Sequence, residues 1–250
     1  MKILESVGMS RSGHHAITNW LIHNMIGFQI EWKYKMTYAS GTKLFVLDEA
    51  NHDIDLSFKF INDSIDKIGT LFVCYEDTPW DYTIFRKDNT FRGNFSLNFQ
   101  ENYEFDYINR FVTIRDFYDN LISRVIANEK NFSKEFDSKE NFYFKTGEKY
   151  IERWKNLAKG CVEKKTPYIK FEDWLDNKEI KQNFIHQVLG SNLYEDSNSV
   201  HGTKSSFGQD NKKRKNYDVN LIPDDIKKLI RDDNELHYLI GALGYDFRKI

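Results

Sequence analysis

Proline, cysteine and long apolar runs are scarce in this 250-residue sequence. It contains three prolines and two cysteines, Cys74 and Cys161, which form neither a CxxC pair nor a zinc-ligand pattern. They indicate buried thiols and no disulfide framework. No run approaches the ~18 consecutive apolar residues of a membrane-spanning helix. No positively charged leader followed by an apolar segment is visible. We therefore expect a cytoplasmic protein with no membrane anchor.

A large excess of either charge is also missing. Lysine and arginine number 36 against 38 aspartates and glutamates, for a net charge of −2. We therefore expect no nucleic-acid partner, and any anion site has to be local. Hydrophobic residues make up 40% of the chain and aromatic residues 16%. At this length the composition predicts a single globular domain over 1–250.

The N-terminal stretch 2–25 has a strand, turn and helix pattern. An apolar strand over 3–7 precedes a turn that holds Gly8, Arg11, Ser12 and Gly13. The first turn of a helix has N–H groups without partners and the positive end of the helix dipole, and glycine lets an anion approach closely. A guanidinium adds a planar fork of donors suited to phosphate or sulfate oxygens. This turn therefore predicts a site for a dianion.

The turn differs from the ATP-binding P-loop, which reads GxxxxGK[ST]. His14 and His15 follow Gly13 in place of the lysine and the magnesium-binding hydroxyl residue. We expect a loop that binds a phosphate-like group without a metal.

Two later strands end in acidic or polar residues. The strand expected over 43–47 leads to His52, and the strand over 70–75 leads to Glu76 and Asp77. Ligands of parallel sheets bind at the carboxyl ends of the strands. From the residues alone, His52 could also be a surface histidine, and the two carboxylates could cap a turn before Pro79.

A further strand, 111–114, ends in Arg115, and a helix is expected from Asp116. Ser123 follows Arg115 by eight residues, about two turns into that helix. From the residues alone, Arg115 could merely cap the strand and Ser123 could be a neutral helix residue.

At the first turn the chain resembles the sulfotransferases that use 3′-phosphoadenosine 5′-phosphosulfate. Arg11, Ser12 and Gly13 match the family's first loop, and His14 and His15 stand where the family has two hydroxyl residues. The resemblance implies that these five residues bind the 5′-phosphosulfate and that Arg11 also takes part in catalysis.

The resemblance extends through the middle of the chain. It implies that Arg115 and Ser123 hold the 3′-phosphate of the donor. It also implies that Glu76, or failing it Asp77 or His52, takes the proton from the acceptor. Residues 190–220 lack periodicity, and the resemblance implies a flexible loop there that covers the donor, with a set of contact residues: Ser205, Ser206 and Phe207.

The rest of the chain is expected to supply the supporting frame. We predict an exposed connection or irregular helix over 131–149, then a helix over 150–158 closed by Gly160, and a strand over 167–171. The resemblance implies that Glu172 and Asp173 support loops rather than react. A helix over 177–189 and one final helix from Pro223 complete the pattern.

These features predict a P-loop-like, three-layer α/β/α fold with a central parallel sheet. The resemblance implies transfer of a sulfuryl group to a hydroxyl or amine of a small-molecule acceptor or a saccharide, with no metal. Two alternatives remain: a P-loop phosphotransferase such as a kinase, which would require magnesium, and a non-catalytic nucleotide- or glycan-binding protein on the same fold.

Overall fold

A computed structural model describes residues 2–9, 12–26, 36–39, 44–48, 69–81, 107–129, 139–190 and 218–247. The strands are β1 (Lys2–Gly8), β2 (Met36–Ala39), β3 (Leu44–Asp48), β4 (Thr70–Glu76), β5 (Tyr107–Ile114) and β6 (Tyr168–Lys170). The helices are α1 (His14–Ile26), α3 (Phe117–Glu129), α4 (Lys139–Val162), α5 (Phe171–Asp176), α6 (Lys178–Leu189), η3 (Val219–Leu221), α7 (Asp224–Asp232) and α8 (Asn234–Ala242).

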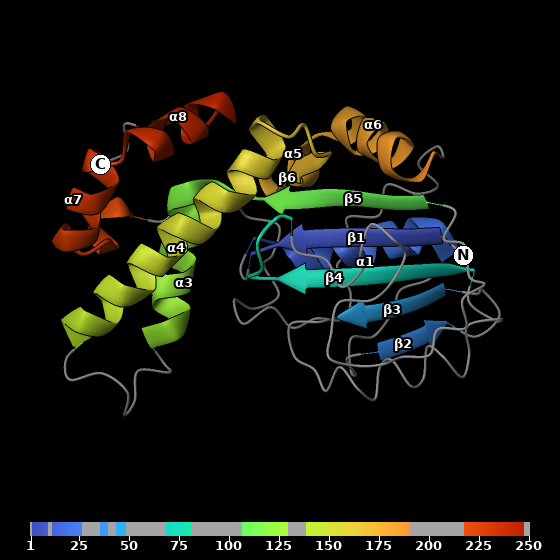
Figure 1. The fold of residues 1–250 in the computed structure, drawn as a ribbon, viewed down its shortest axis with the longest axis horizontal. Helices are drawn as coiled ribbons and strands as arrows, with labels where there is room; N and C mark the ends of the chain where they lie inside the picture. Colours follow the sequence, from blue (N-terminus) through green and yellow to red (C-terminus); the bar gives the residue numbers. More distant parts are fainter. Residues whose placement is uncertain are drawn as a thin grey trace.

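The strands form one sheet in the order β2-β3-β4-β1-β5-β6. The pairs β3–β4, β4–β1, β1–β5 and β5–β6 are parallel, and β2 is antiparallel to β3 at the edge (Figure 1). The α/β class and the parallel core predicted from the sequence are therefore confirmed. The antiparallel strand β2 is an addition, because residues 27–42 show no clear alternation.

Helices pack on both faces of this sheet. On one face, Leu4, Phe72 and Phe111 pack with apolar residues of α1, α5 and α6. On the other, Ile3 and Val7 pack with α3, α4, α7 and α8. Successive residues of a strand point to opposite faces, so the apolar residues of β1 and the near-continuous apolar run of β4 contribute to both cores.

The helix predicted over 150–158 is longer than expected, and Gly160 does not end it. α4 spans Lys139–Val162, and Gly160 is absent from the residues with a positive φ. A Cβ at position 160 would lie 2.7 Å from Cγ of Trp80, so this glycine lets the indole pack against the helix. Gly147 likewise lets Ile226 of α7 pack closely against α4, because a Cβ added at position 147 would lie 2.4 Å from Cδ1 of Ile226. Both glycines obscure the helical pattern in the sequence.

The single final helix predicted from Pro223 is in fact two helices. Asp233 lies between α7 and α8, and its side chain accepts a hydrogen bond from the Leu236 N–H at 2.9 Å. This cap starts α8 in a new direction while both helices keep their apolar residues in the core.

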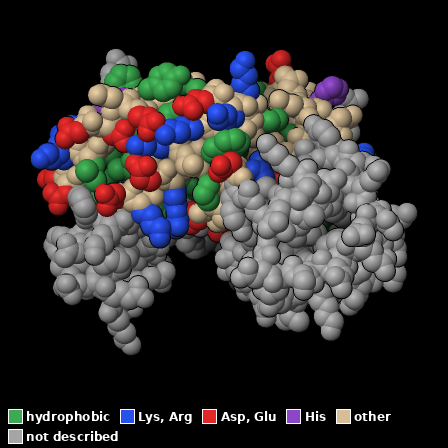
Figure 2. Space-filling model, viewed as in Figure 1, with side chains coloured by type: hydrophobic (Ala, Val, Ile, Leu, Met, Phe, Trp, Pro, Cys, Tyr) green, Lys and Arg blue, Asp and Glu red, His purple; other side chains and the backbone are tan. Residues whose placement is uncertain are grey.

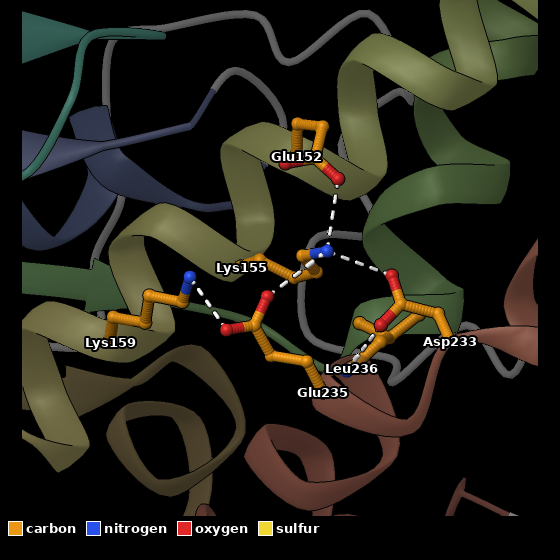
Figure 3. Close-up of polar contacts among 6 residues, drawn as sticks. All are labelled: Glu152, Lys155, Lys159, Asp233, Glu235 and Leu236. Atoms are coloured by element: carbon orange, nitrogen blue, oxygen red, sulfur yellow. Dashed lines mark hydrogen bonds and ion pairs between the residues drawn. The ribbon is translucent and has the colours of Figure 1, made fainter.

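Asp233 also belongs to a charged cluster that joins α4 to α8, which we call the Lys155 cluster (Figure 3). Lys155 Nζ lies 2.8 Å from Asp233, 3.0 Å from Glu152 and 3.2 Å from Glu235. Its last member is Lys159, whose Nζ lies 2.7 Å from Glu235.

The charges of the Lys155 cluster shift one another's pKa values. Burial alone would lower the pKa of Lys155, but hydrogen bonds to Asp233, Glu152 and Glu235 raise it above its ordinary value. Burial alone would raise the pKa of Asp233, but the hydrogen bond from Lys155 lowers it. Hydrogen bonds from Lys159 and Lys155 lower the pKa of Glu235. Lys155, Asp233 and Glu235 are therefore held in their charged forms.

Acidic and basic side chains are interspersed over the face that α4, α7 and α8 present (Figure 2). This mixture agrees with the small net charge of the chain. Within the part of the chain that the structure describes, no helix has the length and apolarity needed to cross a membrane.

Candidate functional site

Three strands of the sheet end together at one edge. Gly8, the last residue of β1, is in register with Glu76 of β4 and with Thr113 of β5. The chain leaves β1 for α1 on one face of the sheet and leaves β5 for α3 on the other. Open α/β sheets bind ligands where neighbouring connections diverge in this way. We group residues of the segments that follow β1, β5 and β6 as the switch-point site: Ser12, Gly13, Arg115, Ser123 and Phe171.

The turn between β1 and α1 is closely packed. The Ser12 N–H donates to the Met9 carbonyl at 3.1 Å. Gly13 has φ +81°, and a Cβ there would lie 2.1 Å from Cδ2 of Phe171. Both its backbone conformation and its neighbour therefore require glycine. Ser12 is buried, and its hydroxyl has no hydrogen-bond partner among the described residues.

The two histidines at the start of α1 are in different environments. His14 is buried, and its Nε2 is hydrogen-bonded to the Ser6 hydroxyl. A Cβ at Gly8 would lie 2.7 Å from Cγ of His14, so the imidazole packs directly against the end of β1. The His15 side chain is 36% exposed, and its Nδ1 lies 3.9 Å from Glu76 Oε1. Of the pair, His15 is the more exposed to solvent.

Arg115 and Gly13 come together through a residue that the sequence did not single out. The Arg115 guanidinium lies over the Phe171 ring, with Cζ 5.2 Å from the ring centroid. The same ring contacts Gly13, as described above. Phe171 begins α5 directly after β6. In the sequence it is only an aromatic residue at the end of another predicted strand, and nothing there indicates a contact with Gly13 or Arg115. The structure thus brings Gly13 and Arg115 to the same aromatic ring.

Glu172 supports the turn between β5 and α3. Its Oε1 accepts the Asp116 N–H at 3.1 Å and lies 4.0 Å from Arg115 Nε. The Asp116 side chain in turn accepts the Asp119 N–H at 3.1 Å, which caps α3. This arrangement agrees with the supporting role expected for Glu172.

Ser123 lies on the buried side of α3, in its second turn. The side chain is 0% exposed, and its hydroxyl has no hydrogen-bond partner in the described part of the chain. A mid-helix serine commonly bonds back to a carbonyl one turn earlier. Ser123 does not, so its hydroxyl is unsatisfied in the same way as that of Ser12.

The two candidate bases after β4 differ in their partners. Asp77 Oδ2 lies 2.6 Å from Arg124 Nη2 and 3.4 Å from Arg153 Nη1. Asp77 also has φ +59°, and its N–H donates to the Gly8 carbonyl at 2.9 Å. Its carboxylate is therefore neutralised by two cations, while Glu76 faces His15.

Trp80 anchors the segment that carries Glu76 to the body of the protein. Its backbone N–H donates a hydrogen bond to Asn156 Oδ1 at 2.7 Å, and its backbone carbonyl accepts one from Arg110 Nη1 at 2.7 Å. Arg110 is itself held by the buried Glu5, with Nη2 2.6 Å from Oε2. These contacts, added to the packing of the indole on Gly160, hold the end of β4 in place.

Several predicted site residues lie outside the described part of the chain: Arg11, His52, Ser205, Ser206 and Phe207. The loop predicted over 190–220 lies outside it except for Gly190 and for residues 218–220, which lead into η3. Among the described residues, no group of three or more His, Cys, Asp or Glu side chains is placed to hold a metal ion.

Comparison of the chain with protein-family models, with curated proteins and with solved structures gives no match.

Proposed function

We propose that this protein is a sulfotransferase that takes a sulfuryl group from 3′-phosphoadenosine 5′-phosphosulfate, on a P-loop-like fold. The acceptor is a hydroxyl or an amine, with saccharides among the acceptor classes. The observation that carries the proposal is that two of the buried hydroxyls without a partner among the described residues, those of Ser12 and Ser123, belong to this site. Leaving a buried hydroxyl unsatisfied costs about 1–3 kcal/mol. Two such groups at one switch point favour a bound ligand that satisfies both.

The residues around these hydroxyls fit the two anionic ends of the donor. Ser12, Gly13 and the first N–H groups of α1 would bind the 5′-phosphosulfate, with Arg11 as an added cation. Arg115 and Ser123 would bind the 3′-phosphate, which distinguishes this nucleotide from ordinary adenine nucleotides. Phe171 contacts both Gly13 and the Arg115 guanidinium, so the two ends of the site are fixed relative to each other.

The bound donor supplies an activated sulfuryl group, and the protein has to stabilise charge and accept a proton. Arg11 and the α1 N–H groups would neutralise the charge that develops on the leaving oxygen. Glu76 would take the proton from the acceptor, since it ends β4 at the same edge of the sheet. Asp77 is less suited to this role because Arg124 and Arg153 already bind its carboxylate.

Calorimetric titration with a set of nucleotides tests the proposal. We expect the wild type to bind adenosine 3′,5′-bisphosphate more tightly than 5′-AMP, ADP or ATP with magnesium. Arg115→Ala should weaken bisphosphate binding about 10- to 100-fold, because a charge-assisted phosphate contact is lost. The matched control is Arg231→Ala, an exposed arginine of α7, which should bind like the wild type.

Two results would contradict the proposal. Preference for ATP with magnesium would favour a phosphotransferase on the same fold. Equal affinity for the bisphosphate and 5′-AMP would remove the basis for a 3′-phosphate site.

A further inference from the structure

The segment after α8 folds back toward the switch-point site. Gly244 has φ +75°, and the Tyr245 N–H donates to the Ile240 carbonyl at 3.0 Å. This turn places the Tyr245 ring against the core, and its hydroxyl donates to Glu172 Oε2 at 2.9 Å. Tyr245 therefore contacts the carboxylate that lies next to Arg115.

The two oxygens of Glu172 have different partners. Oε2 accepts the Tyr245 hydroxyl, while Oε1 accepts the Asp116 N–H and lies 4.0 Å from Arg115 Nε. A separation of 4.0 Å is too long for a hydrogen bond, so this contact is an ion pair only. The side chains of Glu172 and Arg115 are 6% and 12% exposed, so solvent screens the pair only weakly.

Burial also makes the carboxylate sensitive to the loss of any donor. Burial raises the pKa of Glu172, and the backbone N–H groups, the Tyr245 hydroxyl and the Arg115 charge act against that rise. If one of these groups is removed, the remaining ones have to stabilise the buried charge. Arg115 is a cation already close enough to do so.

We propose that Tyr245 is a positioning residue that sets specificity for the 3′-phosphate, an inference that rests on the proposed function. Its hydroxyl holds Glu172 so that the carboxylate orients Arg115 without forming a close bidentate pair. Without that hydroxyl, the carboxylate turns toward the guanidinium and competes with a 3′-phosphate for the same donors. Tyr245 thus acts on the nucleotide through Glu172 and Arg115 and does not touch it.

The test compares Tyr245→Phe with Tyr118→Phe. The Tyr118 hydroxyl donates to the Phe247 carbonyl at 2.8 Å, so this control loosens the same C-terminal segment without affecting Glu172. In titrations with adenosine 3′,5′-bisphosphate and 5′-AMP, Tyr245→Phe should weaken bisphosphate binding about two- to tenfold and leave 5′-AMP binding unchanged. Tyr118→Phe should change neither affinity.

A second measurement needs no ligand. The Nε–H resonance of Arg115, assigned by its loss in Arg115→Lys, should shift in Tyr245→Phe and stay in place in Tyr118→Phe. An unchanged resonance in Tyr245→Phe, an unchanged preference for the bisphosphate, or an equal effect of both substitutions would overturn the positioning role. A shifted resonance in a protein that never prefers the bisphosphate would instead overturn the proposed function and the specificity role, leaving only the contact with Arg115.

Discussion

The Lys155 cluster and the switch-point site are both polar regions at the edge of the same apolar core, yet they differ in how far their groups are satisfied. Lys155 has three carboxylate partners within 3.2 Å, all supplied by α4 and by the start of α8. Ser12 and Ser123 are as deeply buried but have no partner among the described residues. A buried network whose groups all have partners stabilises the fold, whereas buried groups without partners favour the binding of a ligand that supplies them.

The largest difference between the two regions should be in catalysis. Glu76→Gln should lower the rate of sulfuryl transfer about 10²- to 10⁴-fold, because it removes the proton acceptor but keeps the shape of the side chain. Transfer is measured with a ³⁵S-labelled donor and an acceptor identified from hydroxyl and amine compounds, saccharides included. Glu152→Gln in the Lys155 cluster is the control and should leave the rate unchanged. Equal rates in wild type and Glu76→Gln would exclude Glu76 as the base.

The backbone of the switch-point site should also be intolerant of change. Gly13→Ala forces a side chain into the left-handed region and against the Phe171 ring, so we expect a loss of about 2–4 kcal/mol in the free energy of unfolding. Gly190 has φ +67° but no neighbour within 4 Å of an added Cβ, so Gly190→Ala should lose only about 1–2 kcal/mol. Urea denaturation measures both. Similar losses would mean that the contact between Gly13 and Phe171 is unimportant.

Lys155→Met should lower stability without affecting the switch-point site. It leaves Asp233 and two glutamates without their shared cation, so the free energy of unfolding should fall by about 1–3 kcal/mol. Nucleotide affinity should not change. Lys159→Met is a matched control, because the partly exposed Lys159 pairs with Glu235 and with no other carboxylate among the described residues, so it should contribute no more than about 0.5 kcal/mol. Weakened nucleotide binding in Lys155→Met would show that the two regions are coupled.

The smallest expected difference is in the dependence of stability on pH. Asp233 and Glu235 have lowered pKa values, so their stabilisation is complete above the unfolded-state values near pH 4 and is lost as the pH falls below them. Glu172 has a raised pKa, so the folded state binds its proton more tightly. Its contribution is present at low pH and is lost as the pH rises from about 4.5 through the raised value.

Unfolding curves across this pH range should separate the two contributions. Lys155→Met should flatten the acid limb, and Glu172→Gln should flatten the slope above pH 4.5. If neither substitution changes its own part of the profile, groups other than these control how the free energy of unfolding depends on pH.

Much of the frame was predictable from the sequence because it depends on local pattern. The apolar runs of β1, β4 and β5, and the spacing from Arg115 to Ser123, are visible in short stretches of the chain. The parallel order then brings their carboxyl ends together. The turn before α1 could be expected for the same reason, whereas the supporting role of Glu172 was implied only by the resemblance.

The remaining features depend on contacts between distant residues. Gly160 marks the packing site of Trp80 rather than a helix end, and Gly13 is required by the Phe171 ring as well as by its own φ. The bond between Tyr245 and Glu172 joins α5 to the end of the chain. No local sequence pattern predicts such contacts, so the roles of Phe171 and Tyr245 became evident only from the fold.

On the proposed function, the Ser12 and Ser123 hydroxyls lack partners among the described residues because a nucleotide with a 3′-phosphate binds between them. The most direct test is calorimetric titration of adenosine 3′,5′-bisphosphate into the wild type and into the double variant Ser12→Ala/Ser123→Ala. We predict that the double variant is at least as stable as the wild type, since it removes two buried unpaired hydroxyls, and that it binds the bisphosphate about tenfold or more weakly. A double variant that is markedly less stable, or that binds the bisphosphate as tightly as the wild type, would contradict the claim.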